Sequence, residues 1–214
     1  MKKIPIFPLQ LVLFPGEKLP LHIFEPRYKE MLTWCLATGN PFGVVSYLKN
    51  KISRIGCIAT IELVEKKYDD GRADIICTGT DRFSIKKFDS AKSYLQGDIE
   101  TFTDMRDDDD EKKLKMEQLV PLFKELMKMA TQETMTGVID VPVQSYGFAH
   151  LVGFDLQQKQ KLLEMRSEQE RLQYIHRHIR KVLPQIRAFE EVRRKIRSNG
   201  HFRTLPPLSF NIEE

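Results

Sequence analysis

Prolines interrupt the apolar pattern at the start of the chain. Residues 4–28 form an apolar tract that carries five prolines, at positions 5, 8, 15, 20 and 26. Each proline removes a backbone donor and fixes φ, which argues against a central strand and favours short edge strands joined by tight bends. Pro26 stands where the first turn of a helix tolerates proline, and apolar residues at helical spacing follow it to Leu36. The predicted order is strand, loop, strand, helix.

The pattern of β-branched residues extends the β-rich part to about residue 104. Strands are predicted over residues 42–48, 52–64, 73–78, 82–88 and 94–102. Asp70-Gly71 supplies a hairpin turn between the second and third of these strands. Because the connections are short, this part of the chain favours a small, partly closed antiparallel barrel.

The pattern changes from β to α after an acidic stretch. Residues 107–110 are four consecutive aspartates, which suit both a boundary and a helix start, where negative charge offsets the helix dipole. Apolar residues then recur at three- and four-residue steps from Leu119 to Ala130. Further helices are predicted over 141–152 and after Asp155, and a long one from the capping box at 167–170 to Gly200.

The long terminal helix has an apolar seam and a basic surface. The seam has near-heptad spacing and is longer than a small bundle needs, so its end at Phe189 and Ile196 is predicted to meet a partner protein or a second copy in a homodimer. Residues 171–203 contain ten Lys or Arg against two acidic residues, a net charge of plus eight. The usual explanation of such a helix is a solvated face.

The opening motif resembles the amino-terminal, substrate-binding domain of Lon proteases. It comprises Phe7-Pro8-Leu9, residues 12–16, residues 19–25 and Arg27-Tyr28, with weaker matches over 70–72, 79–83 and 145–172. The resemblance implies an α+β fold in which a PUA-like β pseudo-barrel over 1–104 precedes an α-helical bundle over 105–200. Residues 201–214 are expected to form an irregular tail.

The resemblance also implies a function. Such a domain would be a non-enzymatic module that binds unfolded or peptide segments with exposed apolar residues, or a partner such as a protease or chaperone. The candidate contact residues are Leu11, Leu13, Phe14, Leu21 and Phe24 in the opening stretch. We expect Leu11, Leu13 and Phe14 to be only partly covered on a loop. The alternative is that these side chains plug the end of the barrel, as most apolar residues in such a tract are core.

Catalytic and metal-binding patterns are weak in this sequence. It contains no phosphate-cradling Gly-x-x-x-x-Gly-Lys-Ser/Thr loop, and a Ser-Lys peptidase dyad would need a further domain, so no enzyme activity is expected. His176 and His178 are two residues apart on a helix and would point to different sides, as solvated members of the basic surface. His22 is expected to be a hydrogen-bonded structural residue, with Glu25 and Arg27 as an ion pair. No metal and no cofactor is therefore expected.

The alternative function is RNA or other nucleic-acid binding, because PUA-like barrels also bind RNA and the terminal helix is basic. Cys35, Cys57 and Cys77 are odd in number and widely spaced, which suits neither a disulfide framework nor a zinc site. Reduced thiols of this kind favour a cytoplasmic setting and a place in the core. The uncharged stretch 31–48 contains glycine, proline and polar residues, so no membrane span is expected.

Overall fold

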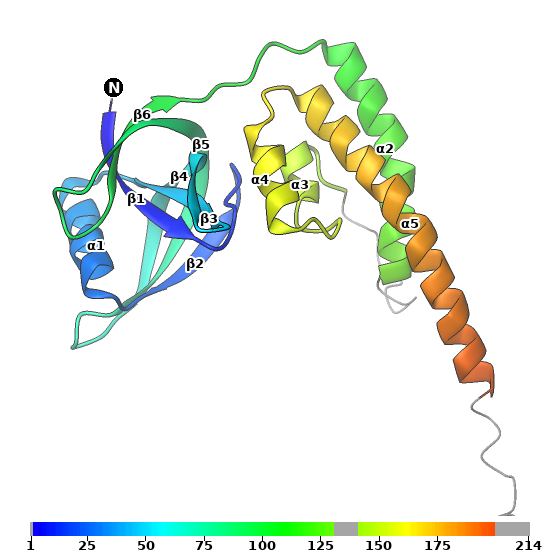
Figure 1. Ribbon diagram of the computed structural model, residues 1–214, viewed down its shortest axis with the longest axis horizontal. Helices are drawn as coiled ribbons and strands as arrows, with labels where there is room; N and C mark the ends of the chain where they lie inside the picture. The colour runs from blue at the N-terminus through cyan, green and yellow to red at the C-terminus, as the bar shows by residue number, and fades with distance from the viewer. Residues whose placement is uncertain (1, 131–140, 200–214) are drawn as a thin grey trace, which may run out of the picture.

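A computed structural model describes residues 2–130 and 141–199 and has the predicted α+β fold. A β pseudo-barrel lies beside a group of helices (Figure 1). The barrel part comprises β1 (Lys2–Leu9), β2 (Lys18–Ile23), α1 (Pro26–Thr38), β3 (Phe42–Leu48), β4 (Lys51–Lys67), β5 (Ala73–Asp89) and β6 (Gln96–Thr101). The helical part comprises α2 (Asp109–Ala130), α3 (Ser145–Phe148), α4 (Leu156–Glu164) and α5 (Glu168–Asn199). The predicted tail 201–214 lies outside the described residues.

The long strand β5 closes the barrel. The sheet order is β2-β5-β4-β3-β1-β6, and β5 also pairs with β6. Along one edge of β5, residues 73–78 pair with β2 and residues 83–89 pair with β6. β2 is therefore an edge strand, and β5 is its only partner among the described strands. The barrel is not purely antiparallel, because β1 and β3 run parallel.

β5 replaces the two shorter strands that were predicted over 73–78 and 82–88. Gly79 follows the first of these two predicted strands, and in the structure it lies inside β5. A Cβ atom there would come within 2.2 Å of the carbonyl oxygen of Phe14. Glycine is needed at this point because the loop between β1 and β2 crosses β5 at close range.

The prolines of β1 contradict one expectation. Pro5 and Pro8 argue against a strand with neighbours on both sides, yet β1 has β6 on one side and β3 on the other. The two neighbours divide the strand, since residues 2–5 pair with β6 and residues 6–9 pair with β3. Each half thus behaves as an edge, where proline is tolerated. In β2, Pro20 lies on an edge strand as predicted.

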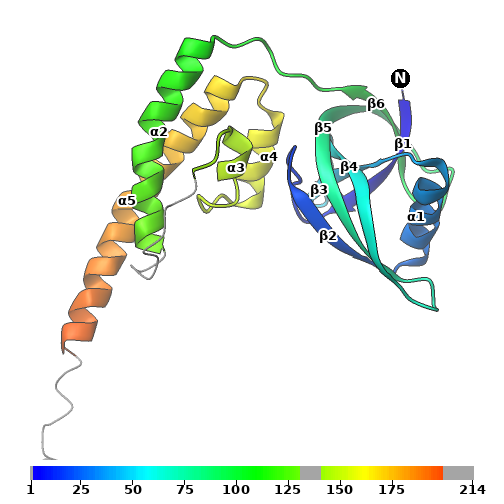
Figure 2. The same ribbon diagram turned by 180° about the vertical axis from the view of Figure 1, so that it is seen from behind.

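The helices pack around a core of their own. α2 and α5 lie side by side, and α5 continues past the end of α2 (Figures 1 and 2). Of the helix predicted over 141–152, only the short α3 forms. The helix predicted after Asp155 is α4, and it begins with a capping box: Asp155 Oδ1 accepts from the backbone N of Gln158 at 2.8 Å, and Gln158 Oε1 accepts from the backbone N of Asp155 at 2.9 Å.

The buried side chains form clusters within the barrel and within the helices. Met31 and Cys35 of α1 pack with Phe42 and Cys57 in one barrel cluster, while Phe123 and Ile175 lie in the helical cluster. All three cysteines are free and buried, as predicted. Within residues 2–130 and 141–199, no helix has both the length and the apolar character that a membrane span requires.

Candidate functional site

The loop between β1 and β2 lies at the interface between the barrel and the helices, which we call the joint. Leu13 and Phe14 are each 1% exposed, so the expectation that they are only partly covered is wrong. The loop is held down by two backbone bonds: Gly16 N donates to Gly79 O, and Gly79 N donates to Glu17 O, both at 2.8 Å. These bonds turn Leu13 into the barrel core and Phe14 into the helical core.

Phe14 is buried, as the alternative interpretation proposed, but its side chain packs between the barrel and the helices and not in the end of the barrel. Its ring stacks on Tyr146 with centroids 5.2 Å apart and meets the ring of His150 edge-on at 5.4 Å. Glu17 Oε2 accepts from Phe14 N at 2.9 Å, and Glu17 Oε1 lies 2.9 Å from His150 Nε2. The loop therefore connects the barrel to α3 through both packing and polar contacts.

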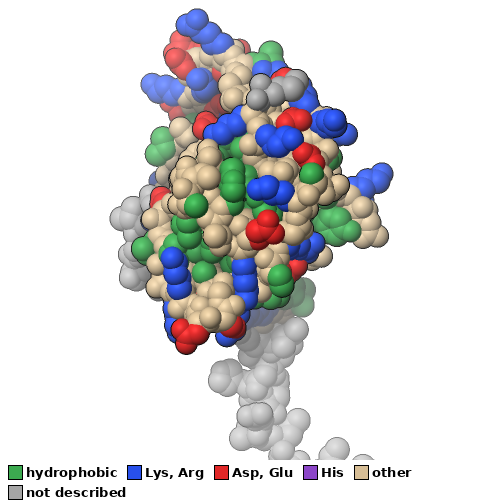
Figure 3. Space-filling view, turned by 90° about the vertical axis from the view of Figure 1, so that its left-hand side faces the viewer, with side chains coloured by type: hydrophobic (Ala, Val, Ile, Leu, Met, Phe, Trp, Pro, Cys, Tyr) green, Lys and Arg blue, Asp and Glu red, His purple; other side chains and the backbone are tan. Residues whose placement is uncertain are grey.

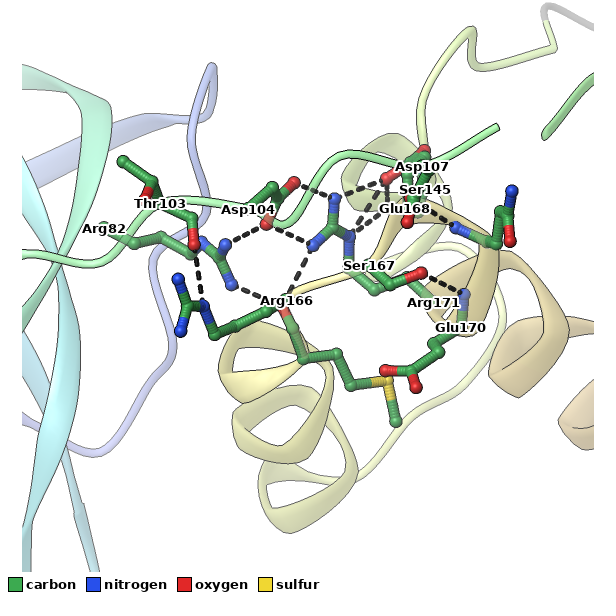
Figure 4. A network of polar contacts seen from close by, with 12 residues as sticks. Arg82, Thr103, Asp104, Asp107, Ser145, Arg166, Ser167, Glu168, Glu170 and Arg171 are labelled. Carbon is green, nitrogen blue, oxygen red and sulfur yellow. Dashed lines mark hydrogen bonds and ion pairs between the residues drawn. The ribbon is translucent and has the colours of Figure 1, made fainter. Parts of the chain in front are cut away.

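Two buried arginines form the polar part of the joint (Figure 4). Arg82 of β5 donates Nη1 to Leu163 O at 2.7 Å and to Met165 O at 2.5 Å, next to the end of α4. Its Nη2 pairs with Asp104, in the segment that leads from the barrel to α2. Arg171 of α5 donates to both carboxylate oxygens of Asp104, at 3.0 and 2.6 Å. Asp104 thus bridges the barrel and the last helix.

The remaining members of this network balance the buried charge. Arg171 also pairs with Glu168 at 2.7 Å, and Glu168 accepts from the backbone N and the hydroxyl of Ser145 at 2.7 and 2.6 Å. The ring of Tyr146 lies against Arg171, 4.6 Å from its guanidinium carbon. Burial raises the pKa of Tyr146 to about 12, although Arg171 and Arg82 act in the opposite direction. The two carboxylates compensate two desolvated cations, and the network connects β5 of the barrel to α5 through Asp104.

In contrast to these buried contacts, the outer side of three strands of the barrel carries exposed apolar side chains. Leu21, Ile75 and Val64 are aligned across β2, β5 and β4 and pack on the barrel core. Side chains alternate along a strand, so the adjacent row faces the other way. That row is apolar and comprises Pro20, Ile76 and Leu63. Leu63 is 52% exposed.

Aromatic side chains extend this row toward the hairpin between β4 and β5. The ring of His22 stacks on Phe24 and meets Tyr68 edge-on, each with centroids 6.0 Å apart. Phe24 is 58% exposed. We call the set the β2–β5–β4 surface, and it consists of Pro20, His22, Phe24, Leu63, Tyr68 and Ile76.

His22 is hydrogen-bonded, as predicted. Its Nδ1 lies 2.5 Å from Asp74 Oδ1, and Asp74 Oδ2 accepts from the hydroxyl of Tyr68 at 2.8 Å. These two bonds, that from His22 first, hold the pKa of Asp74 below its usual value. The predicted ion pair of Glu25 and Arg27 forms at 2.7 Å. These polar contacts hold the aromatic rings of the surface in place.

The remaining candidates lie apart from each other. Leu11 and Leu21 are half-buried against the barrel core. Phe189 is 66% exposed on α5, whereas the side chain of Ile196 lies outside the described residues. Seen from the barrel end, apolar side chains are interspersed with lysine and arginine (Figure 3). The five opening candidates therefore do not form one surface.

No metal centre is present among the described side chains. In residues 2–130 and 141–199, no three His, Cys, Asp or Glu side chains gather in a way that could hold an ion. His178 is not a solvated surface residue as expected, because its Nε2 donates to the carbonyl oxygen of Val152 at 2.9 Å. Its role is to tie α5 to the turn before α4.

Comparison with known proteins identifies the family. Residues 3–181 match the ATP-dependent protease La (LON) substrate-binding domain. The chain belongs to this family. It is 24% identical over 212 residues to the Lon protease of Flavobacterium johnsoniae, covering 91% of this chain and 26% of that protein. It is 29% identical over 132 residues to the Lon protease of Parabacteroides distasonis, covering 58% of this chain and 16% of that protein. The chain thus spans about a quarter or less of these relatives.

Solved structures share the fold of this Lon substrate-binding domain. A Lon N-terminal domain protein from Xanthomonas campestris superposes with a TM-score of 0.58 at 23% identity, covering 86% of this chain and 98% of that one. The N-terminal domain of a Mycobacterium avium complex Lon protease gives a TM-score of 0.63 at 19% identity, with 83% and 98% covered. The family resemblance and the α+β fold that it implied are confirmed.

Sequence reasoning missed the residues that connect distant elements. Arg82 was noted only as part of the motif at 79–83, and nothing local indicates that it reaches α4. Leu63 and Ile76 were read only as strand residues. The signal that could have found them is the paired apolar run Ile75-Ile76, which places one side chain on each face of β5. Nothing in a single sequence indicates that Asp104 pairs with both Arg82 and Arg171.

Proposed function

We propose that this Lon substrate-binding domain is a non-enzymatic module that captures exposed apolar segments of unfolded proteins for a Lon-type protease. The observation that supports it most directly is the β2–β5–β4 surface, where the exposed Pro20, Phe24 and Leu63 lie near the half-buried Ile76 and Tyr68. Full burial of a Leu or Phe side chain contributes about 1.5–3 kcal/mol. Covering the exposed parts of Leu63 and Phe24 would thus favour a bound peptide.

The chemistry of the surface suits loose, side-chain-based recognition. Pro20 has no backbone N–H, so β2 lacks one donor for a peptide that adds itself as a further strand. Apolar contacts carry little directional information, which favours a broad range of unfolded segments over one sequence. Leu11 can contribute only its exposed part, Leu21 packs on the barrel core on the opposite side of the sheet, and Leu13 and Phe14 act by packing between the barrel and the helices.

The absence of catalysis is part of the proposal. Burial raises the pKa of each cysteine thiol, Cys35, Cys57 and Cys77, to about 12, so these thiols stay protonated and unreactive. Three free thiols also favour a reducing, cytoplasmic setting.

A double variant tests the proposed surface. Phe24→Ser with Leu63→Ser should weaken binding of a labelled, permanently unfolded protein about tenfold, a loss of about 1.4 kcal/mol, because two apolar contacts are lost. Leu151→Ser is the matched control, since Leu151 is 46% exposed but lies in the helical part. Fluorescence anisotropy gives both affinities. Equal binding by the double variant and the control would contradict the proposal.

The free end of α5 supports a second contact. Phe189 and Val192 are exposed on the carboxy-terminal part of α5, the helix that continues past the end of α2 in Figure 1, and Ile196 follows on the predicted seam. We propose that this segment packs on a partner protein, such as a protease or chaperone, or on a second copy. Light scattering of the double variant Phe189→Ser with Ile196→Ser measures the mass of the assembly. An unchanged mass together with unchanged binding of a partner protein would rule this contact out. Nucleic-acid binding by the basic helix remains the alternative function.

A further inference from the structure

A basic pocket lies between α2 and α5, away from the barrel. Its volume is about 230 Å³, room for several water molecules. Four of its lining residues are basic, Lys115 from α2 and His176, Arg177 and Arg180 from α5. The amides of Gln118 and Gln173 complete its polar wall.

The basic residues of the pocket differ from two other arginines of α5, Arg171 and Arg187. Arg171 is paired with Asp104 and Glu168, and Arg187 donates Nε to Glu125 at 2.9 Å. In the part of the chain that the structure describes, no carboxylate forms an ion pair with any of the four pocket residues. The pocket therefore concentrates positive charge without internal compensation.

The local electrostatics agree with this arrangement. The pKa of His176 is lowered, first by burial and then by the charges of Arg180 and Lys115. Like charges three residues apart on one helix, as in Arg177 and Arg180, destabilise it, and Lys115 adds a further positive charge from α2. An anion in the pocket would remove this repulsion, and a guanidinium can bind a carboxylate through two parallel hydrogen bonds.

We propose that this pocket binds clustered carboxylates of an acidic polypeptide segment. The inference rests on the proposed function, to which it adds a second, electrostatic subsite. A polypeptide is favoured over single-stranded nucleic acid, because base stacking relies on large aromatic platforms and the pocket lining contains no Phe, Tyr or Trp. Gln118 and Gln173 offer both donors and acceptors, which suits the amide groups of a peptide.

The test compares a glutamate-rich labelled peptide with its glutamine counterpart. The wild-type domain should bind the glutamate peptide at least about tenfold more tightly. The triple variant Lys115→Gln, Arg177→Gln, Arg180→Gln should lose this preference. The control with the same change in net charge is Lys113→Gln, Lys124→Gln, Lys128→Gln on α2, outside the pocket, and it should lose less than about twofold.

Three results would overturn the inference: an equal loss in both triple variants, no preference for glutamate in the wild type, or displacement of the peptide by single-stranded RNA at lower concentration. Binding of the apolar unfolded protein is measured in parallel and should be unchanged in the pocket variant. If the wild-type domain binds the apolar unfolded protein but shows no preference for glutamate, only the pocket proposal is rejected. The effect of changing Phe24 and Leu63 on binding of the apolar unfolded protein tests only the proposed function. Arg180→Gln alone repeats the test if the triple variant fails to fold.

Discussion

At the scale of single residues, apolar side chains of the opening stretch differ in what they do. Leu13 packs in the barrel core, Phe14 packs between the subdomains, and Phe24 is largely exposed. The sequence shows that these residues are apolar and lie among prolines, but it does not indicate which of them are buried and which are exposed. The separation depends on the close crossing of the loop over Gly79, a contact between residues more than sixty positions apart.

Truncation of Phe14 should be costly. Phe14→Ala removes a buried ring from the joint and should lower the free energy of unfolding by about 3–5 kcal/mol. Leu11→Ala, at a half-buried position, should cost clearly less. Denaturant unfolding measures both. A loss below about 1 kcal/mol for Phe14→Ala would show that its ring is not part of a packed joint.

At the scale of elements, β5 has the most partners. It pairs with β2, β4 and β6 and carries Arg82 into the helical part. The positions of most strands and of α1 follow from apolar pattern, turn residues and proline, and the capping box of α4 follows from Asp155 and Gln158. The merging of two predicted strands into β5 could not be predicted, because Gly79 has the local signature of a break and its real constraint is tertiary.

Loss of Arg82 should loosen the joint. Arg82→Met keeps the apolar stem but leaves the carbonyls of Leu163 and Met165 without this donor, so we expect a loss of about 1–3 kcal/mol in unfolding free energy. Amide exchange should accelerate at the end of α4. Lys86→Met is the control on the same strand, since its pair with Glu100 is solvent-exposed and should contribute little. Unchanged exchange in Arg82→Met would show that the network does not hold the subdomains.

At the scale of the whole molecule, a fixed joint separates two surfaces of different chemistry. The β2–β5–β4 surface is apolar and aromatic, and the pocket between α2 and α5 is basic. The family resemblance gave the overall architecture, because its opening motif is long and ordered. It did not give the surfaces, because these combine residues from strands or helices that are distant in sequence, such as Leu63 with Pro20 and Lys115 with Arg180.

We expect apolar segments to bind on the outer side of β2, β5 and β4. The most direct measurement is an NMR titration of the isotope-labelled domain with an unfolded apolar peptide. We expect saturable shifts of the amides near His22, Phe24, Leu63 and Ile76, and none of comparable size along α5. Saturable binding whose shifts lie on α5, or elsewhere away from these strands, would contradict the account.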